Sequence, residues 1–313
     1  MSSLNQLWPI PSLVRTARMT LLTCLTAGVA TAAHANLDYT VGFVGDISGI
    51  SDLMSPIVQH VGAALADWGQ HLVGSAKIDV EVQLTDSVVA AAASSRASAY
   101  VGEQAGMKIY GSGMAFKINQ GVDVNGDTPD IEILLNPTYL RNELWFDPAP
   151  FSRQALVPLD KVDAMSLFIH EVGHALAFNG WGDHFDGTLP ADYASTWDIH
   201  TVFDAGDLYF TGPRAMQMYG GAVPITLGNN YHIGNANGPG ADLLPDIMNG
   251  VAFFHGQRYD ISSMDIAMLQ DMGVLVQAVP EVETVWLMAY GLAAMAATMR
   301  LRRRLIPARR DCQ

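Results

Sequence analysis

The spacing of the hydrophobic residues near the start of the chain changes twice, from that of a strand to that of a helix and back. Residues 38–45 have the pattern of a strand, and residues 77–85 alternate strictly between polar and apolar side chains, as a half-exposed strand does. Between them, residues 53–72 carry apolar side chains at helical spacing: Met54, Ile57, Val58, Val61, Leu65, Trp68 and Leu72. The order strand, helix, strand predicts a βαβ unit.

The later segments are less regular. Residues 90–121 are rich in small side chains and predict no particular element, whereas residues 131–135 form a short apolar strand. Residues 180–260 are rich in Gly, Asn, Asp and Pro, which is typical of ordered loops. A last helix is expected over residues 262–272.

A helix is also predicted from Lys161 to about Phe178, with Asp160 as its N-cap residue. Its apolar side chains cover a broad surface: Met165, Leu167, Phe168, Ile169, Val172 and Leu176. We therefore expect this helix to be largely buried.

This helix contains His170, Glu171 and His174, which form an HExxH motif. Its spacing places both imidazoles on one helix face, one turn apart, as two Zn–N bonds of about 2.0–2.1 Å require. Zinc with three protein ligands lowers the pKa of its bound water toward about 7, and a neighbouring carboxylate, here Glu171, accepts the proton. This chemistry hydrolyses peptide bonds, so the motif predicts a Zn²⁺-dependent peptidase.

The residues alone leave the third zinc ligand open. No glutamate occurs between Glu171 and Glu281, which disfavours a site with a downstream glutamate ligand. The short pattern HExxHxxGxxH needs glycine at 177 and histidine at 180, where this chain has Ala177 and Gly180. The remaining downstream candidates are four histidines: His184, His200, His232 and His255.

Residues 170–180, HEVGHALAFNG, resemble the leishmanolysin-like branch of the metzincin zinc peptidases. In that branch HExxHALGF is followed by small residues, and the third histidine arrives after an insertion. Three later segments follow in the family's order of third ligand, Met-turn and closing helix: Tyr231-His232, Asp246-Ile247-Met248-Asn249 and residues 261–273. The resemblance covers about residues 130–273.

This resemblance implies an α+β, metzincin-like domain: a twisted mixed sheet with the active-site helix above a cleft, and an irregular lower subdomain. It implies that His232 is the third ligand, with His184 as the alternative, and that Met248 forms an apolar floor under the metal. It also implies that residues 131–135 are the edge strand that pairs with an extended substrate, although spacing alone equally allows an internal strand.

Two features complicate this interpretation. The family has glycine where this chain has Ala177, and alanine is strained at positive φ, so we expect Gly180 to make the turn after the helix. Separately, a carboxylate-rich loop could coordinate calcium, but it lacks the glycine and the closing glutamate of an EF-hand, which favours a solvated turn: Asp123, Asn125, Asp127 and Asp130.

The first 35 residues have the pattern of a signal peptide. A polar start with two arginines precedes an apolar stretch, which ends at the small-x-small sequence Ala33-His34-Ala35. The stretch is short for a membrane span, and the residues before Cys24 do not favour lipid attachment there. We therefore expect export and a mature chain that begins at Asn36.

The last segment, residues 279–313, combines Val279-Pro280-Glu281, an apolar run and a cluster of arginines. This layout resembles the PEP-CTERM sorting tail of Gram-negative bacteria, although Val282 replaces the second proline. The resemblance implies an exosortase-type sorting partner, a transient inner-membrane position for the tail, and a final location at the cell surface or outside the cell.

The predicted domain between these ends, residues 36–278, is strongly acidic. It has 28 acidic and nine basic side chains, and its net charge of −19 disfavours nucleic acid and anionic lipid surfaces as partners. Cys24 and Cys312 both lie in the predicted ends, so we expect no disulfide within the domain.

Together these patterns predict a secreted zinc endopeptidase that acts on protein or peptide substrates. The alternative is a non-catalytic surface or matrix protein with a peptidase-derived fold that zinc stabilises. The presence of Glu171 favours the enzyme.

Overall fold

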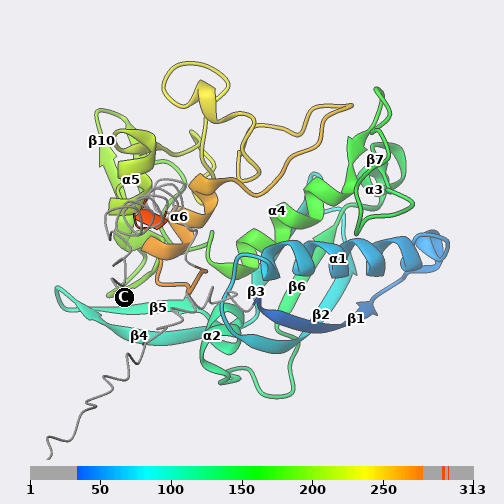
Figure 1. Cartoon of the computed structure of the whole chain (residues 1–313), viewed down its shortest axis with the longest axis horizontal. Coiled ribbons are helices and arrows are strands. Elements are labelled where there is room, and N and C mark those ends of the chain that lie inside the picture. The colour runs from blue at the N-terminus through cyan, green and yellow to red at the C-terminus, as the bar shows by residue number, and fades with distance from the viewer. Residues whose placement is uncertain (1–33, 278–290, 293–294, 296–313) are drawn as a thin grey trace, which may run out of the picture. The chain divides into compact units, whose positions relative to one another are not determined.

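The computed structural model describes residues 34–277, 291–292 and 295 and has an α+β architecture (Figure 1). Its main sheet has the order β1-β2-β6-β3, with these bounds: β1 Asn36–Val44, β2 Ser75–Leu84, β6 Ile131–Leu135 and β3 Ala91–Ser95. Strands β1, β2 and β6 are parallel, and β3 runs antiparallel to β6 at the edge. The predicted βαβ unit is therefore confirmed.

Helices α1 (Met54–Gly69) and α4 (Ala164–Leu176) lie side by side over the main sheet (Figure 1). All residues of α4 are buried, and Trp68 of α1 is fully buried against it. The Trp68 indole Nε1 donates a 2.8 Å hydrogen bond to the carbonyl of Ile169. Because Ile169 precedes the HExxH motif, this contact fixes the helix that carries the motif.

Helix α4 begins later than the sequence predicted. Asp163, and not Asp160, is the N-cap residue, and its carboxylate accepts hydrogen bonds from the Ser166 backbone N–H (3.2 Å) and hydroxyl (2.8 Å). The preceding residues are extended because β8 (Val162–Asp163) pairs with β7 (Leu144–Trp145). Tertiary pairing therefore overrides the local helix signal.

Strand β6 is internal, so the expectation that residues 131–135 form the edge strand is wrong. The edge strand next to β6 is β3, whose sequence is Ala-Ala-Ala-Ser-Ser, and β1 forms the opposite edge. Small side chains suit a strand that packs closely against α4, but they give no visible alternation. The same unpatterned stretch also contains a hairpin and a helix: β4 Ser98–Gln104, β5 Met107–Ser112 and α2 Gly113–Gln120.

The rest of the chain contains short elements between ordered loops. The loop-rich segment 180–260 includes strands and a helix that the sequence did not predict: β9 Tyr193–Ser195, β10 Thr201–Asp204, β11 Asp207–Phe210, α5 Pro213–Tyr219 and β12 Val223–Pro224. Helix α3 (Pro137–Asn142) follows β6. The predicted last helix is confirmed as α6 (Ser263–Asp271), which begins with a capping box between Ser262 and Asp265.

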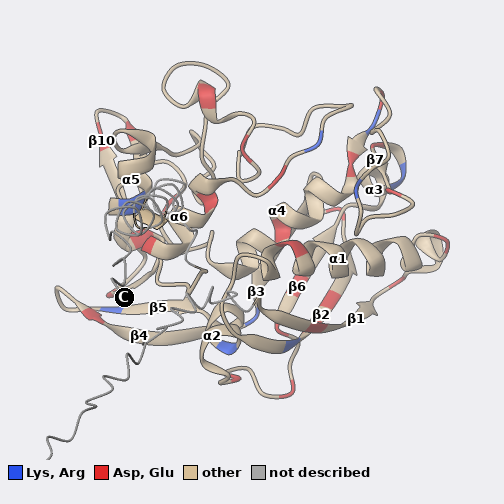
Figure 2. Cartoon of the chain, in the orientation of Figure 1, with Lys and Arg blue, Asp and Glu red and all other residues tan. Residues whose placement is uncertain are grey.

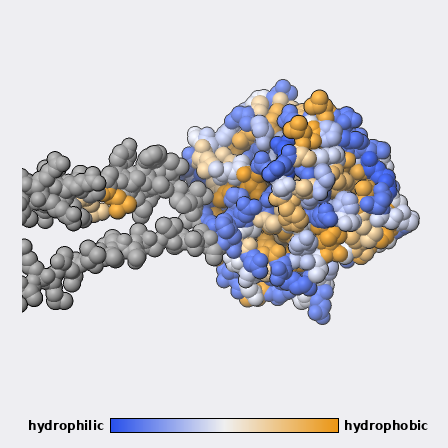
Figure 3. Space-filling view, turned by 45° about the vertical axis from the view of Figure 1, so that its right-hand side comes forward, coloured by the Kyte–Doolittle hydropathy of each residue, from blue (hydrophilic) through white to orange (hydrophobic). Residues whose placement is uncertain are grey.

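The predicted signal peptide and sorting tail lie outside the described residues, apart from residues 34–35, 291–292 and 295. In the described part of the chain, no helix is both long and apolar enough to cross a membrane. Acidic side chains are spread over many of the described elements (Figure 2). On the face that Figure 3 shows, hydrophobic residues lie in small groups between hydrophilic ones.

Candidate metal centre

Helix α4 provides two histidines whose rings are held in fixed orientations. Nδ1 of His170 lies 2.7 Å from the carbonyl oxygen of Ile247, and Nδ1 of His174 lies 2.6 Å from that of Phe178. A carbonyl oxygen only accepts hydrogen bonds, so both rings carry their proton on Nδ1. Each Nε2 is then free to act as a ligand, and the two Nε2 atoms are 2.9 Å apart.

His232 completes a cluster of three imidazoles. Its Nε2 lies 3.1 Å from that of His170 and 3.0 Å from that of His174. A tetrahedral site with Zn–N bonds of 2.0–2.1 Å has nitrogen–nitrogen distances of about 3.3 Å, close to this triangle. The Nε2 lone pairs of His170 and His174 face each other, an arrangement that a bound cation stabilises. The three histidines can therefore hold a metal ion such as zinc.

Burial keeps the three imidazoles in the neutral form that binds metals. Desolvation lowers the pKa of His170 to about 3 and that of His174 to about 4. It also lowers the pKa of His232 well below the usual range of histidine. Protons therefore do not compete for the site at neutral pH.

Glu171 lies beside the cluster on α4 and is buried, with 3% of its surface exposed. Burial raises the pKa of its carboxyl to about 8, and the backbone N–H of Ala93 in β3 lowers it in part. Its Oε2 atom makes no hydrogen bond to any described residue. A buried carboxyl oxygen without a partner is unfavourable in a merely structural position and is a common feature of functional sites.

Comparisons with known protein families, with curated proteins and with solved structures found no match to this chain. The chemistry of the cluster therefore carries the functional assignment.

Met248 is fully buried and packs beneath α4. A Cβ atom added at Gly173 would lie 2.7 Å from the Met248 sulfur, so glycine at this position allows the close contact. The backbone N–H of Met248 donates to Asp246 (2.9 Å), and the neighbouring Ile247 carbonyl holds His170. The segment around Met248 thus orients a ligand through its backbone.

The other downstream histidines lie outside the cluster. The His184 ring packs against Tyr231, with 5.2 Å between ring centroids, and its nitrogen atoms are not part of the cluster that His170, His174 and His232 form. His200 and His255 form hydrogen bonds elsewhere, 2.9 and 3.1 Å long. Of the candidates from the sequence, the structure brings only His232 to His170 and His174 within the described residues.

The chain leaves α4 without a left-handed residue. Ala177 has φ −171°, an extended value that any residue adopts, so it is not strained. The expectation that Gly180 makes a left-handed turn is wrong, because its φ is not positive. A Cβ atom at Gly180 would instead lie 2.3 Å from Oδ1 of Asp198. Glycine is needed there because Asp198 binds the loop closely, accepting from the backbone of Trp181 (3.0 Å) and Gly182 (3.1 Å).

The acidic loop considered as a calcium site is already paired with a cation. The Lys117 ammonium lies 2.8 Å from carboxylate oxygens of both Asp123 and Asp130. The Asp123 carboxylate also accepts backbone hydrogen bonds from Asn125 and Gly126, each 3.0 Å long. These contacts pair the acidic charge of the loop with Lys117, and the Asp130 side chain is buried, so the loop is only in part the solvated turn that the sequence favoured.

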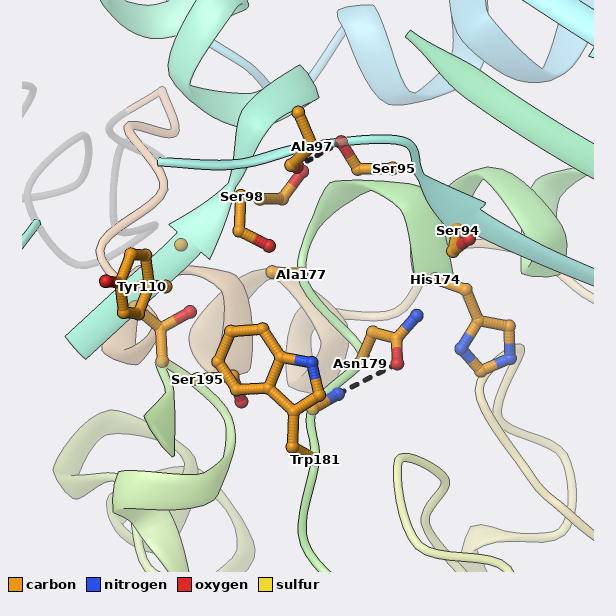
Figure 4. A pocket seen from close by; sticks show the side chains of 14 residues that line it. Ser94, Ser95, Ala97, Ser98, Tyr110, His174, Ala177, Asn179, Trp181 and Ser195 are labelled. Atoms are coloured by element: carbon orange, nitrogen blue, oxygen red, sulfur yellow. Dashed lines mark hydrogen bonds between the residues drawn. The ribbon is translucent and has the colours of Figure 1, made fainter. Parts of the chain in front are cut away.

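Two pockets adjoin the cluster. The first, which we call the apolar pocket, has a volume of about 330 Å³ and contains His170, Glu171 and His232, with these side chains among its walls: Tyr139, Leu167, Val251 and Phe253. The second, which we call the serine pocket, has a volume of about 260 Å³ and contains His174 beside uncharged polar groups, among them Ser94, Ser95, Ser98, Asn179, Trp181 and Thr196 (Figure 4).

Several parts of the site gave no signal in the sequence. Backbone groups hold the ligands and approach the glutamate: the carbonyls of Phe178 and Ile247 and the N–H of Ala93. Backbone groups belong to every residue, so only the fold reveals which ones reach the site. Trp181, in the serine pocket, was also missed because it lies in a segment predicted only as loop.

Proposed function

We propose that this chain is a zinc-dependent endopeptidase of the metzincin type. The observation that carries the proposal is the convergence of three neutral imidazoles beside the unpartnered Oε2 of Glu171. The donor set fits zinc, because His170 and His174 each have their Nδ1–H held by a backbone carbonyl. Three protein ligands are typical of catalytic zinc sites, whereas structural sites usually have four.

His170, His174 and His232 would hold the zinc ion, which would supply an acidified water and a Lewis acid for the substrate carbonyl. Oε2 of Glu171 would accept a proton from the attacking water and return it to the leaving amine. Burial raises the pKa of this carboxyl to about 8 in the metal-free chain, and a zinc ion beside it would lower that pKa and favour the carboxylate that accepts the proton. Met248 supports the underside of α4, and the adjacent carbonyl keeps His170 in the ligand tautomer.

Strand β3 offers a place for an extended substrate. The Asn136 N–H donates to the Ala90 carbonyl (2.9 Å), so by antiparallel alternation the even-numbered residues of this segment pair with β6. The odd-numbered residues then turn their backbone groups to the open edge: Ala91, Ala93 and Ser95. The contact between Ala93 and Glu171 supports this direction. A peptide can add to such an edge by main-chain hydrogen bonds.

We also propose that the protein is exported and acts at the cell surface or outside the cell. The support comes from the sequence patterns of residues 1–35 and 279–313, with an exosortase-type machinery as the partner of the tail. The acidic domain disfavours nucleic acid, and its charge would attract cationic protein or peptide substrates weakly.

A non-catalytic, zinc-stabilised surface protein would use the same three histidines. Glu171 distinguishes the two proposals, because a purely structural site gains nothing from a buried carboxyl with an unpartnered oxygen.

Casein hydrolysis by the full-length chain tests the function. We expect hydrolysis that a chelator abolishes, that added zinc restores, and that inhibitors of serine peptidases leave unchanged. The non-catalytic alternative predicts that chelation lowers the melting temperature while no state of the protein cleaves casein. That second result would overturn the proposal.

A further inference from the structure

The serine pocket is lined by polar groups that make no hydrogen bond to any described residue. They are Ser98 Oγ, Asn179 Nδ2 and Trp181 Nε1; Ser98 is exposed, and Asn179 and Trp181 are half-buried (Figure 4). Oδ1 of Asn179 accepts a 2.8 Å hydrogen bond from Gly180, which leaves the amide nitrogen for the pocket. Polar groups at the wall of a pocket can exchange their hydrogen bonds to water for hydrogen bonds to a ligand.

The aromatic ring at the pocket is held rigidly. The Trp181 ring meets Tyr110 edge to face at 5.9 Å between centroids and Tyr193 at 4.9 Å. The Trp181 backbone is fixed by Asp198, which accepts its N–H at 3.0 Å. Since both ring and backbone are fixed, the indole N–H has a defined direction before any ligand binds.

The pocket contains no charged side chain. Its lining is made of hydroxyl, amide, aromatic and small groups together with His174, whose Nε2 lies 2.9 Å from that of His170 and 3.0 Å from that of His232. A charged ligand group would therefore be desolvated without a counter-ion. An apolar group would displace water from the half-buried Asn179 and Trp181 without replacing its hydrogen bonds.

The serine pocket lies at a defined end of the open strand. Strand β3 runs from Ala91, at the apolar pocket, to Ser94 and Ser95, at the serine pocket, and Ala93 faces Glu171 between them. A peptide paired antiparallel to β3, the more stable pairing, runs in the opposite direction. Its residues before the scissile bond then lie at the serine pocket.

We propose that the serine pocket binds an amide side chain, glutamine above all, at one of the three substrate positions before the scissile bond. This inference rests on the proposed peptidase function. The carbonyl of the amide accepts from Trp181 Nε1 and Asn179 Nδ2, and its NH₂ group donates to Ser98 Oγ. A volume of about 260 Å³ accommodates a side chain as long as glutamine.

Cleavage of a peptide library by the zinc-loaded full-length chain tests this inference. We expect one fixed position before the cleaved bond to be enriched in glutamine. Matched peptides with Gln, Glu, Lys or Leu at that position should then show kcat/KM about tenfold or more higher for Gln, the size of one or two lost hydrogen bonds.

Variants of the pocket should change this preference in defined directions. Asn179→Asp keeps the shape and the acceptor for Gly180 but adds a negative charge, so the Lys peptide should gain about tenfold relative to the Gln peptide. Trp181→Phe keeps an aromatic ring and removes the N–H, so the preference for Gln over Leu should fall about tenfold. As a control, Ser55→Ala on the exposed side of α1 should leave the preference unchanged.

The outcomes separate this inference from the function on which it rests. Zinc-dependent cleavage with no preference at these positions overturns the inference alone. The same holds if Trp181→Phe keeps the wild-type preference, a result that decides the matter even where Asn179→Asp does not fold. Absence of zinc-dependent cleavage of every peptide overturns the peptidase function and this inference with it.

Discussion

At the scale of single residues, the candidate metal centre depends on which ring nitrogen of each histidine carries the proton. The carbonyls of Ile247 and Phe178 place that proton on Nδ1 in His170 and His174, and burial keeps both rings neutral. The Nε2 atoms of the folded chain can therefore bind a metal ion without first losing a proton. The residues alone did not single out His232 as the third member of the cluster. Its substitution is therefore the most informative test of the ligand set.

We expect His232→Ala to lose zinc, whereas His184→Ala keeps it. Removing one of three ligands should weaken zinc binding by about 100-fold or more, because two imidazoles remain. His184 packs against Tyr231 and contributes no nitrogen atom to the three-histidine cluster. Zinc per chain after dialysis measures both variants, with His200→Ala as a matched control. The reverse pattern, with zinc lost only in His184→Ala, would refute the assignment of the third ligand.

Glu171→Gln should change how the stability of the metal-free chain depends on pH. Burial raises the pKa of Glu171 from 4.5 to about 8. Between these values the unfolded chain releases a proton that the folded chain retains, so this carboxyl costs stability as pH rises. The stability of wild type relative to Glu171→Gln should therefore be greatest below about pH 4.5 and should decline up to about pH 8. Denaturant unfolding of both chains across this range measures it, and a pH-independent difference contradicts the assigned burial.

At the scale of elements, α4 and the segment beneath it form one unit. We expect Gly173→Ala to destabilise the chain by about 1–3 kcal/mol, because the new methyl group would lie 2.7 Å from the Met248 sulfur and 3.2 Å from Trp68. This cost opposes the gain of about 1 kcal/mol that alanine brings to a helix interior. Zinc affinity should also fall, since displacement of Met248 moves the neighbouring Ile247 carbonyl from His170.

Unfolding by denaturant and zinc titration measure this prediction. Gly49→Ala is the matched control, because no atom lies within 4 Å of the added Cβ and φ is not positive there. A Gly173→Ala chain that is more stable than wild type and binds zinc normally would contradict the packing described here.

The sequence predicted the elements whose burial is regular. Strand β2 buries Ile78, Val80 and Val82 on one face, so its alternation was visible. Strand β3 contains only alanine and serine because it packs under α4, and its position at the edge of the sheet could not be read from hydrophobicity. Pairing between β7 and β8 keeps residues 162–163 extended, so α4 begins at Ala164, a start that the local capping signals did not predict.

Only part of the candidate site was predictable from the sequence. The spacing of His170 and His174 on a helix follows from the sequence alone, whereas His232 was singled out only through a family resemblance. The distance along the chain between α4 and His232 gives no local pattern, and His184 is closer in sequence. The two pockets combine residues from several elements, so they required the tertiary structure.

At the scale of the whole molecule, the cluster joins a central helix to the loop-rich part of the chain. We expect removal of zinc to lower the melting temperature by roughly 10 °C. Zinc present at about 1,000 times its dissociation constant stabilises by about 4 kcal/mol, and each kcal/mol shifts the midpoint by about 2–4 °C at this size.

Thermal unfolding with and without a chelator measures this shift. His170→Ala is the control, because a chain that has lost a ligand should respond little to the chelator. If chelation removes the zinc from the wild-type chain and its melting temperature does not change, the metal does not join these parts of the molecule.

The most direct test of the account is the zinc content and casein hydrolysis of Glu171→Gln, measured beside wild type. Glutamine keeps the shape of the side chain but cannot accept the proton of the water, and the three ligands are untouched. The account predicts one zinc per chain in both proteins and hydrolysis reduced by about 10²–10⁴-fold in Glu171→Gln. Hydrolysis at the wild-type rate by zinc-loaded Glu171→Gln would contradict the account.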